Sequence, residues 1–236
     1  MSFACSPRSE RTPRVYIWKL ICKTGYINCP DVRKRCLLPT APEQKFALQL
    51  NRTIVLVGLM GAGKTSVGKR LAAFLDVTFA DSDHEVEAAA GMSISDIFAQ
   101  FGEAHFRDGE RKVISRLLTS DPCVLATGGG AFLSDQVRDD VSRLGVSVWL
   151  DADLDTLWDR VKDRDTRPLL KRDNPRQVLS DLLDARAPVY ARAAIRVPSD
   201  PDISHEVMVR RILEAIRADD LAHPSRPATL TMRPAS

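Results

Sequence analysis

The chain contains 236 residues, 44% of them hydrophobic and 28% charged, with 12 glycines and 14 prolines. These values are typical of a globular protein and argue against the disordered and collagen-like classes. No apolar stretch approaches the roughly 20 residues that a membrane-spanning helix needs, so we expect no membrane segment.

Charge and cysteine are unevenly distributed along the chain. Residues 1–50 hold 9 lysines and arginines against 3 acidic residues, whereas the remaining 186 residues hold 25 against 28. A slightly acidic body does not bind nucleic acid by electrostatics, although a pocket of arginines there could bind one small anion. The only cysteine of the body, Cys123, lies in an apolar run and is typical of a core residue in a reducing compartment.

The composition predicts three regions. Residues 1–50 carry five prolines and no sustained periodicity, and we expect a disordered extension. An organelle presequence and a folded accessory element are the alternatives, and the first of these would replace the expected cytoplasmic location. Residues 51–217 form one domain. Residues 218–236 mix proline with small polar residues and are expected to be a disordered tail.

In the central region, short apolar runs alternate with amphipathic stretches, a pattern typical of βαβ units and a parallel sheet. In chain order, the sequence predicts a strand at 53–57, a helix at 64–75, a strand at 77–80, helices at 94–100 and 103–118, a strand at 123–126, a helix at 135–144, a strand at 146–150, helices at 154–161 and 175–187, a strand at 195–197 and a helix at 203–218.

The first predicted strand leads into a glycine-rich loop, Gly58-Leu-Met-Gly-Ala-Gly-Lys64-Thr65. This loop matches G-x-x-x-x-G-K-[ST], and a strand before it and a helix after it supply the required context. Its backbone N–H groups can surround phosphate oxygens, while Lys64 reaches the β- and γ-phosphates and the Thr65 hydroxyl binds Mg²⁺. We therefore predict a nucleotide site. Because GTPase motifs are lacking, a small-molecule kinase or a nucleotide-gated binding module remains.

Two acidic residues follow the second predicted strand. Asp81 and Asp83 are spaced i, i+2, so on an extended chain both would point towards the phosphate loop if the first two strands are neighbours. One carboxylate could then support Mg²⁺ through water while the other accepts the proton of an attacking hydroxyl. A solvated loop with helix-capping aspartates is the alternative.

Four further segments carry candidate ligands for an anion. Arg107 lies in Phe106-Arg-Asp-Gly-Glu110, inside a predicted helix. The alternative to an anion-binding role is a surface arginine whose aliphatic stem packs against the neighbouring aromatic ring. The run Gly128-Gly-Gly-Ala131 follows a strand and indicates close approach to bare backbone. A loop arginine that closes over ATP could stabilise the charge on the transferred group, and fixed arginines could bind a substrate carboxylate. The candidates are Arg160, Arg164, Arg167 and Arg172 in one stretch and Arg186 and Arg192 in another.

Together these segments resemble the shikimate kinase family. The resemblance spans about residues 50–218 and rests on six motifs in order and approximate spacing, at 58–65, 81–83, 106–110, 128–131, 167–170 and 186–192. It implies the α/β P-loop kinase fold, with a five-stranded parallel sheet flanked by helices and a mobile lid. It also implies ATP-dependent phosphorylation of the 3-hydroxyl of shikimate, towards chorismate and aromatic amino acids, by a monomer with only small-molecule partners.

The same resemblance implies a role for each matching residue. The ATP ligands would be Gly61, Ala62, Gly63, Lys64, Thr65 and Ser66, with Arg167 from the lid and Arg160 near the adenine. Mg²⁺ would bind Thr65 directly and Asp81 through water. Shikimate would bind Asp83, Arg107, Gly129 and Arg192. Catalysis would depend on Asp83, Lys64 and Arg167.

Overall fold

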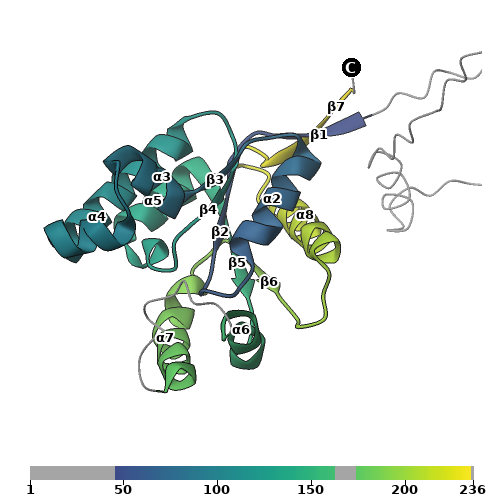
Figure 1. Ribbon diagram of the computed structural model, residues 1–236. Helices are drawn as coiled ribbons and strands as arrows, with labels where there is room; N and C mark the ends of the chain where they lie inside the picture. Colours follow the sequence, from purple (N-terminus) through teal and green to yellow (C-terminus); the bar gives the residue numbers. More distant parts are fainter. Residues whose placement is uncertain (1–45, 163–173, 235–236) are drawn as a thin grey trace, which may run out of the picture. The chain divides into compact units, whose positions relative to one another are not determined.

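Five parallel strands form the central sheet, in the order β3-β4-β2-β5-β6 (Figure 1). They are β2 (Thr53–Val57), β3 (Phe79–Asp81), β4 (Val124–Ala126), β5 (Gly145–Asp151) and β6 (Ile195–Pro198). All residues of β2 and β4 are buried, because continuous apolar runs suit strands that are covered on both faces. This computed structural model describes residues 46–162 and 174–234. The predicted five-stranded parallel sheet is confirmed.

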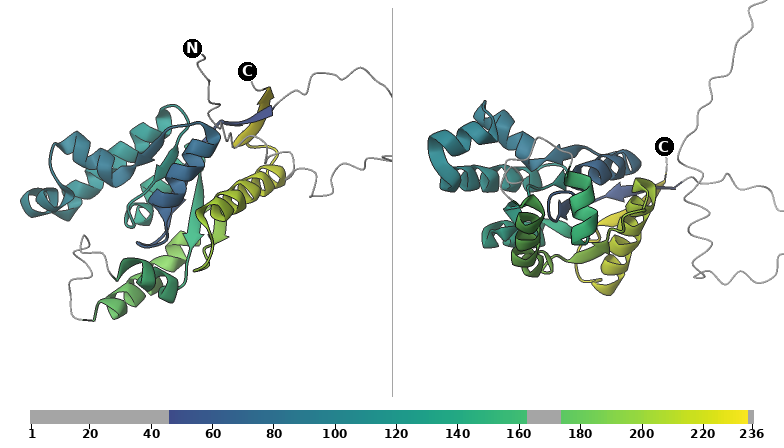
Figure 2. Two further views of the ribbon diagram at one scale, coloured as in Figure 1. Left: turned by 45° about the vertical axis from the view of Figure 1, so that its right-hand side comes forward. Right: turned by 60° about the horizontal axis from the view of Figure 1, so that its bottom comes forward.

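Helices cover the sheet and one of its ends. They are α2 (Lys64–Leu75), α3 (Ser82–Ala90), α4 (Ile94–Thr119), the short 3₁₀ helix η2 (Ala131–Leu133), α5 (Asp135–Leu144), α6 (Leu154–Val161), α7 (Pro175–Tyr190) and α8 (His205–Ala222). Helix α2 packs on α8, and α4 packs on both α3 and α5. Both views in Figure 2 place α6 and α7 together, away from the chain's C-terminal end. In the described residues, no helix is long and apolar enough to span a bilayer.

The strongly periodic elements coincide with the sequence predictions, and the differences have local causes. The predicted helices at 94–100 and 103–118 both form. They share the label α4 but are separated by a kink at Gly102, whose φ of 79° and ψ of 173° are not helical. Helix α3 is not predicted from the sequence, since its Ala-rich and acidic residues show little apolar periodicity and only Ser82 and Val86 are buried.

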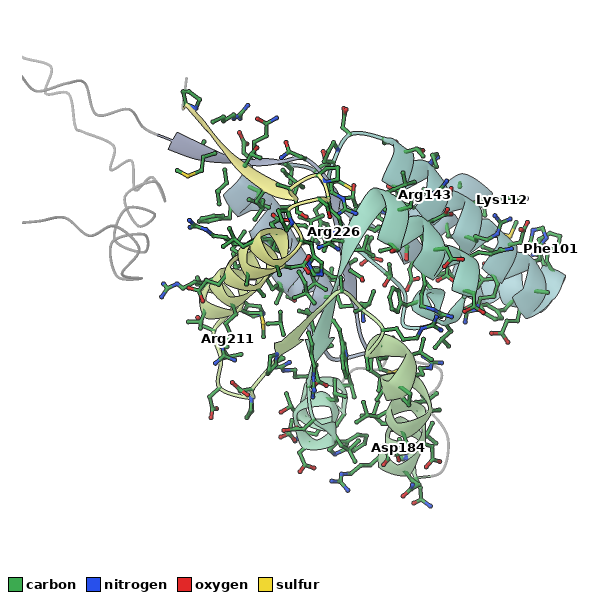
Figure 3. All side chains as sticks on the ribbon, turned by 180° about the vertical axis from the view of Figure 1, so that it is seen from behind. Phe101, Lys112, Arg143, Asp184, Arg211 and Arg226 are labelled. Carbon is green, nitrogen blue, oxygen red and sulfur yellow. The ribbon has the colours of Figure 1, made fainter. Side chains whose placement is uncertain are left out.

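Both predicted domain boundaries differ from the structure. Strand β1 (Phe46–Leu50) pairs antiparallel with β7 (Leu230–Pro234), and α8 continues past 218 to Ala222. The Asp220 carboxylate accepts hydrogen bonds from the N–H groups of Thr229, at 2.9 Å, and Leu230, at 3.1 Å. Arg226, labelled in Figure 3, donates to Asp219 at 2.6 Å. These side chains fold the C-terminal segment back onto α8, an effect that composition alone does not reveal.

Candidate active site

The phosphate loop connects β2 to α2 and is held close to neighbouring elements. A Cβ atom at Gly58 (φ 139°) would lie 2.8 Å from the Leu150 carbonyl oxygen, and one at Gly61 (φ 86°) would lie 2.8 Å from Val161 Cγ1. Only glycine fits such close approach with a positive φ. The Nζ atom of Lys64, the first residue of α2, donates to the carbonyl oxygen of Gly58 at 2.8 Å. The loop thus brings the lysine and the helix N-terminus together.

Thr65 and Asp81 bring two oxygen ligands to the edge of this loop. Thr65 Oγ1 donates to Asp81 Oδ2 at 3.0 Å. Asp81 ends β3 and also caps α3, because its Oδ1 accepts from the Asp83 N–H at 3.2 Å. Hydroxyl and carboxylate oxygens suit Mg²⁺, which usually takes one or two protein ligands and completes its shell with phosphates and waters. The pair therefore fits the ion that the sequence predicts.

Asp83 reaches the site by a different route from the predicted one. The expectation that Asp81 and Asp83 alternate along a strand beside the phosphate-loop strand is wrong, since β3 pairs with β4 and Asp83 lies in the first turn of α3. Its carboxylate instead lies against Gly128, where an added Cβ would collide with Oδ1. Burial raises the pKa of Asp83, and the nearby Asp81 raises it further, against the opposing effect of Lys64.

Arg107 and Glu110 form a half-buried ion pair beside residues 128–130, the glycine loop that follows β4. Arg107 Nη1 donates to Glu110 Oε2 at 2.7 Å, and Nη2 donates to Glu103 at 3.3 Å. Burial alone would lower the pKa of Arg107, but hydrogen bonds and attraction from the two glutamates outweigh this effect and raise it. The guanidinium lies so close to Gly130 that a Cβ there would be 2.6 Å from Nη1 and from Nη2. Arg107 is thus a fixed cation at the bare backbone of the loop.

The glycine loop itself is oriented by side chains from two helices. Ser82 Oγ, at the start of α3, accepts from the Gly128 N–H at 2.9 Å. The Gly129 carbonyl accepts from Tyr190 Oη at 2.5 Å and from Arg186 Nη1 at 3.1 Å, both on α7. Sequence reasoning missed Ser82 and Tyr190. The i, i+4 spacing of Arg186 and Tyr190 is the signal that places both on one helix face.

Of the other predicted arginines, the structure places Arg160 at the phosphate loop and Arg192 in an exposed ion pair. Arg160, in the last turn of α6, donates to the carbonyl of Gly61 at 3.4 Å and to Ser199 Oγ at 3.1 Å, so it lies over the phosphate loop. Arg192 is exposed and pairs with Asp135 at 3.6 Å. Arg167 and the predicted lid lie outside the described residues, as do Arg164 and Arg172.

A sequence model of the shikimate kinase family matches residues 60–217. The chain belongs to this family. The matched range includes every site element described above except the beginning of the phosphate loop, and it leaves out the strands β1 and β7.

The chain is also similar to individual shikimate kinases. The shikimate kinase of Ruegeria pomeroyi is 55% identical over 170 residues, which are 72% of this chain and 87% of that protein. That of Paramagnetospirillum magneticum is 56% identical over 168 residues, 71% of this chain and 86% of that protein. A solved shikimate kinase from Acinetobacter baumannii, in complex with shikimate, has a TM-score of 0.68 and 38% identity over 72% of this chain and 95% of its own. A gluconokinase from Sinorhizobium meliloti, at 19% identity and a TM-score of 0.50, shares the fold alone.

Shikimate kinase membership decides between the two classes that the phosphate loop leaves open. The chain is a kinase with ATP as co-substrate, and not a nucleotide-gated binding module. The residues around the loop can therefore be assigned to two substrates.

Proposed function

We propose that this chain transfers the γ-phosphoryl group of ATP to the 3-hydroxyl of shikimate, forming shikimate 3-phosphate and ADP in the route to chorismate. One observation carries the proposal: Asp83, Arg107 and the glycine loop meet beside the phosphate loop, at the carboxyl ends of β2, β3 and β4. Ligands of α/β sheets bind at this edge. Family membership and a shikimate-bound relative at 38% identity support the choice of acceptor.

On the ATP side, residues 61–66 hold the phosphates, and Lys64 places a positive charge near the β- and γ-phosphates. Thr65 would hold Mg²⁺ directly and Asp81 would hold it through water, and the ion would neutralise charge on the phosphate oxygens. From the resemblance, Arg160 would lie near the adenine, and Arg167, which is outside the described residues, would bind the phosphates from the lid. Lid closure would exclude water and limit wasteful hydrolysis of ATP.

On the acceptor side, Arg107, Arg192 and the Gly129 backbone hold the shikimate carboxylate, and Asp83 orients the 3-hydroxyl. As the oxygen–phosphorus bond to shikimate forms and the bond to ADP breaks, the hydroxyl proton passes to Asp83. The raised pKa of Asp83 makes its carboxylate a better proton acceptor than an exposed aspartate. Positioning and charge stabilisation supply most of the acceleration in such a transfer.

The test is ADP release by the full chain with shikimate, gluconate, AMP or no acceptor. Of these four conditions, we expect rapid ADP release only with shikimate. Asp83→Asn should retain ATP binding and lose most turnover. Rapid release with gluconate or AMP instead of shikimate would overturn the proposed acceptor, and turnover close to wild type in Asp83→Asn would remove that residue from the mechanism.

A monomeric state, a cytoplasmic location and the lack of nucleic-acid or membrane partners stay predictions from the sequence. Light scattering of the purified full chain measures the first of these. Mass spectrometry of the native N-terminus tests the organelle alternative, because removal of a presequence would shorten residues 1–50.

A further inference from the structure

We propose that Tyr190 and Arg186 are positioning residues for the acceptor, because together they orient the peptide group between Gly129 and Gly130. This inference rests on the proposed function, since the acceptor carboxylate is the group that this peptide would meet. Neither side chain is among the ligands that the resemblance implies, and both act through the backbone of the glycine loop.

The Gly129 carbonyl is saturated from one side. Tyr190 Oη donates to it at 2.5 Å and Arg186 Nη1 at 3.1 Å, and a carbonyl oxygen has two lone pairs to offer. The Tyr190 side chain is fully buried, and its ring packs near Trp149 with centroids 6.2 Å apart. Burying a phenol is unfavourable unless its hydroxyl is hydrogen-bonded, so the bond to Gly129 fixes where this ring can lie.

The opposite side of the same peptide is open. Among the described residues, no protein group accepts a hydrogen bond from the Gly129 or Gly130 N–H, whereas the Gly128 N–H donates to Ser82. In a trans peptide the C=O and N–H vectors point in opposite directions, and the described chain has no cis peptide bonds. Holding the Gly129 carbonyl against α7 therefore directs the Gly130 N–H away from α7.

A cation lies close to this open side. The Arg107 guanidinium fills the space where a Gly130 Cβ would be, at 2.6 Å. A directed N–H beside a guanidinium is a good site for a carboxylate, because hydrogen bonds to charged groups are stronger than neutral ones. Burial also raises the pKa of Tyr190, although Arg186 opposes the effect, so the hydroxyl stays a donor at neutral pH.

The experiment compares Tyr190→Phe and Arg186→Met with a matched control in the full chain. Each variant removes one donor from the Gly129 carbonyl. The control, Thr53→Val, removes a buried hydroxyl that accepts from the Cys123 N–H at 3.3 Å, outside the site. We expect the KM for shikimate to rise about 3- to 10-fold in each site variant, the range for losing one hydrogen bond. The kcat and the KM for ATP should stay within about twofold, and the double variant should exceed the product of the two single effects.

Calorimetric titration with shikimate gives a second readout, in which the dissociation constant should rise in parallel with KM. If both site variants leave the KM and the dissociation constant unchanged and only lower the melting temperature, as in Thr53→Val, then the two side chains are merely structural. If Tyr190→Phe does not fold, the half-buried Arg186 carries the same test. Failure of the wild-type chain to phosphorylate shikimate would instead refute the proposed function.

Discussion

Replacing Gly128 by alanine should separate folding from catalysis. The backbone there is outside the left-handed region, so alanine fits the local conformation. The new methyl group would collide with Asp83 Oδ1 and would lie 3.0 Å from Glu110 Oε1. The Asp83 carboxylate is the softer obstacle, because Glu110 is only 2% exposed and is bound to Arg107.

The size of the effect follows from the displacement. To regain ordinary contact with the methyl group, the Asp83 oxygen must retreat by about 1 Å, and a misplacement of that size costs on the order of 10²-fold in rate. This loss corresponds to about 2.7 kcal/mol of transition-state stabilisation. ATP binding should be unchanged, since the phosphate loop is untouched. The smaller entropy of the unfolded chain offsets part of the strain, by about 0.4–1 kcal/mol.

The assay measures kcat with shikimate, ATP binding by calorimetry and the free energy of unfolding in urea. Gly109→Ala is the matched control, because Gly109 lies in α4 and a Cβ there meets nothing within 4 Å. That control should keep its kcat and gain about 0.5–1 kcal/mol in stability. A kcat within threefold of wild type in Gly128→Ala would show that the position of Asp83 does not limit the reaction.

Three other substitutions test the remaining parts of the structure. Asp83→Asn should raise the melting temperature at pH 7. The pKa of Asp83 is raised in the folded state, so the wild-type protein loses stability as pH rises through that pKa, and asparagine removes this loss. In thermal scans below about pH 4, where Asp83 is protonated in both states, the two proteins should melt at the same temperature. Arg107→Ala should raise the KM for shikimate about tenfold or more while leaving the KM for ATP unchanged, and an unchanged shikimate KM would place the carboxylate elsewhere. Asp220→Ala should free the amides of Thr229 and Leu230, seen as faster hydrogen exchange in β7 with unaltered kcat; protection equal to wild type would contradict its role.

The surroundings of the Glu110 carboxylate could not be predicted from the sequence. Its Oε1 atom is buried without a hydrogen-bond partner in the described structure. Burial raises its pKa, and Asp83 raises it as well, although Arg107 opposes both effects. The sequence places Glu110 three residues after Arg107, which indicates their pairing on one helix face. It does not indicate that α3 brings a second carboxylate to the same spot.

Local patterns alone predict much of this protein. The phosphate loop is recognisable because its glycines, lysine and threonine act within eight consecutive residues between two strongly periodic elements. The helix at 64–75 and the strand at 53–57 follow directly from apolar spacing, and six ordered motifs indicate the family. In each case the physical cause lies within a few residues of its effect.

Contacts between distant segments required the tertiary structure. Strand order, and not alternation along one strand, determines that Asp83 meets Gly128. The two donors to the Gly129 carbonyl, Arg186 and Tyr190, come from α7 and lie 57 and 61 residues later in the chain. The pairing of β1 with β7 joins the two ends of the described chain. Such contacts depend on how the sheet and helices pack, because each segment's own sequence is compatible with more than one neighbour.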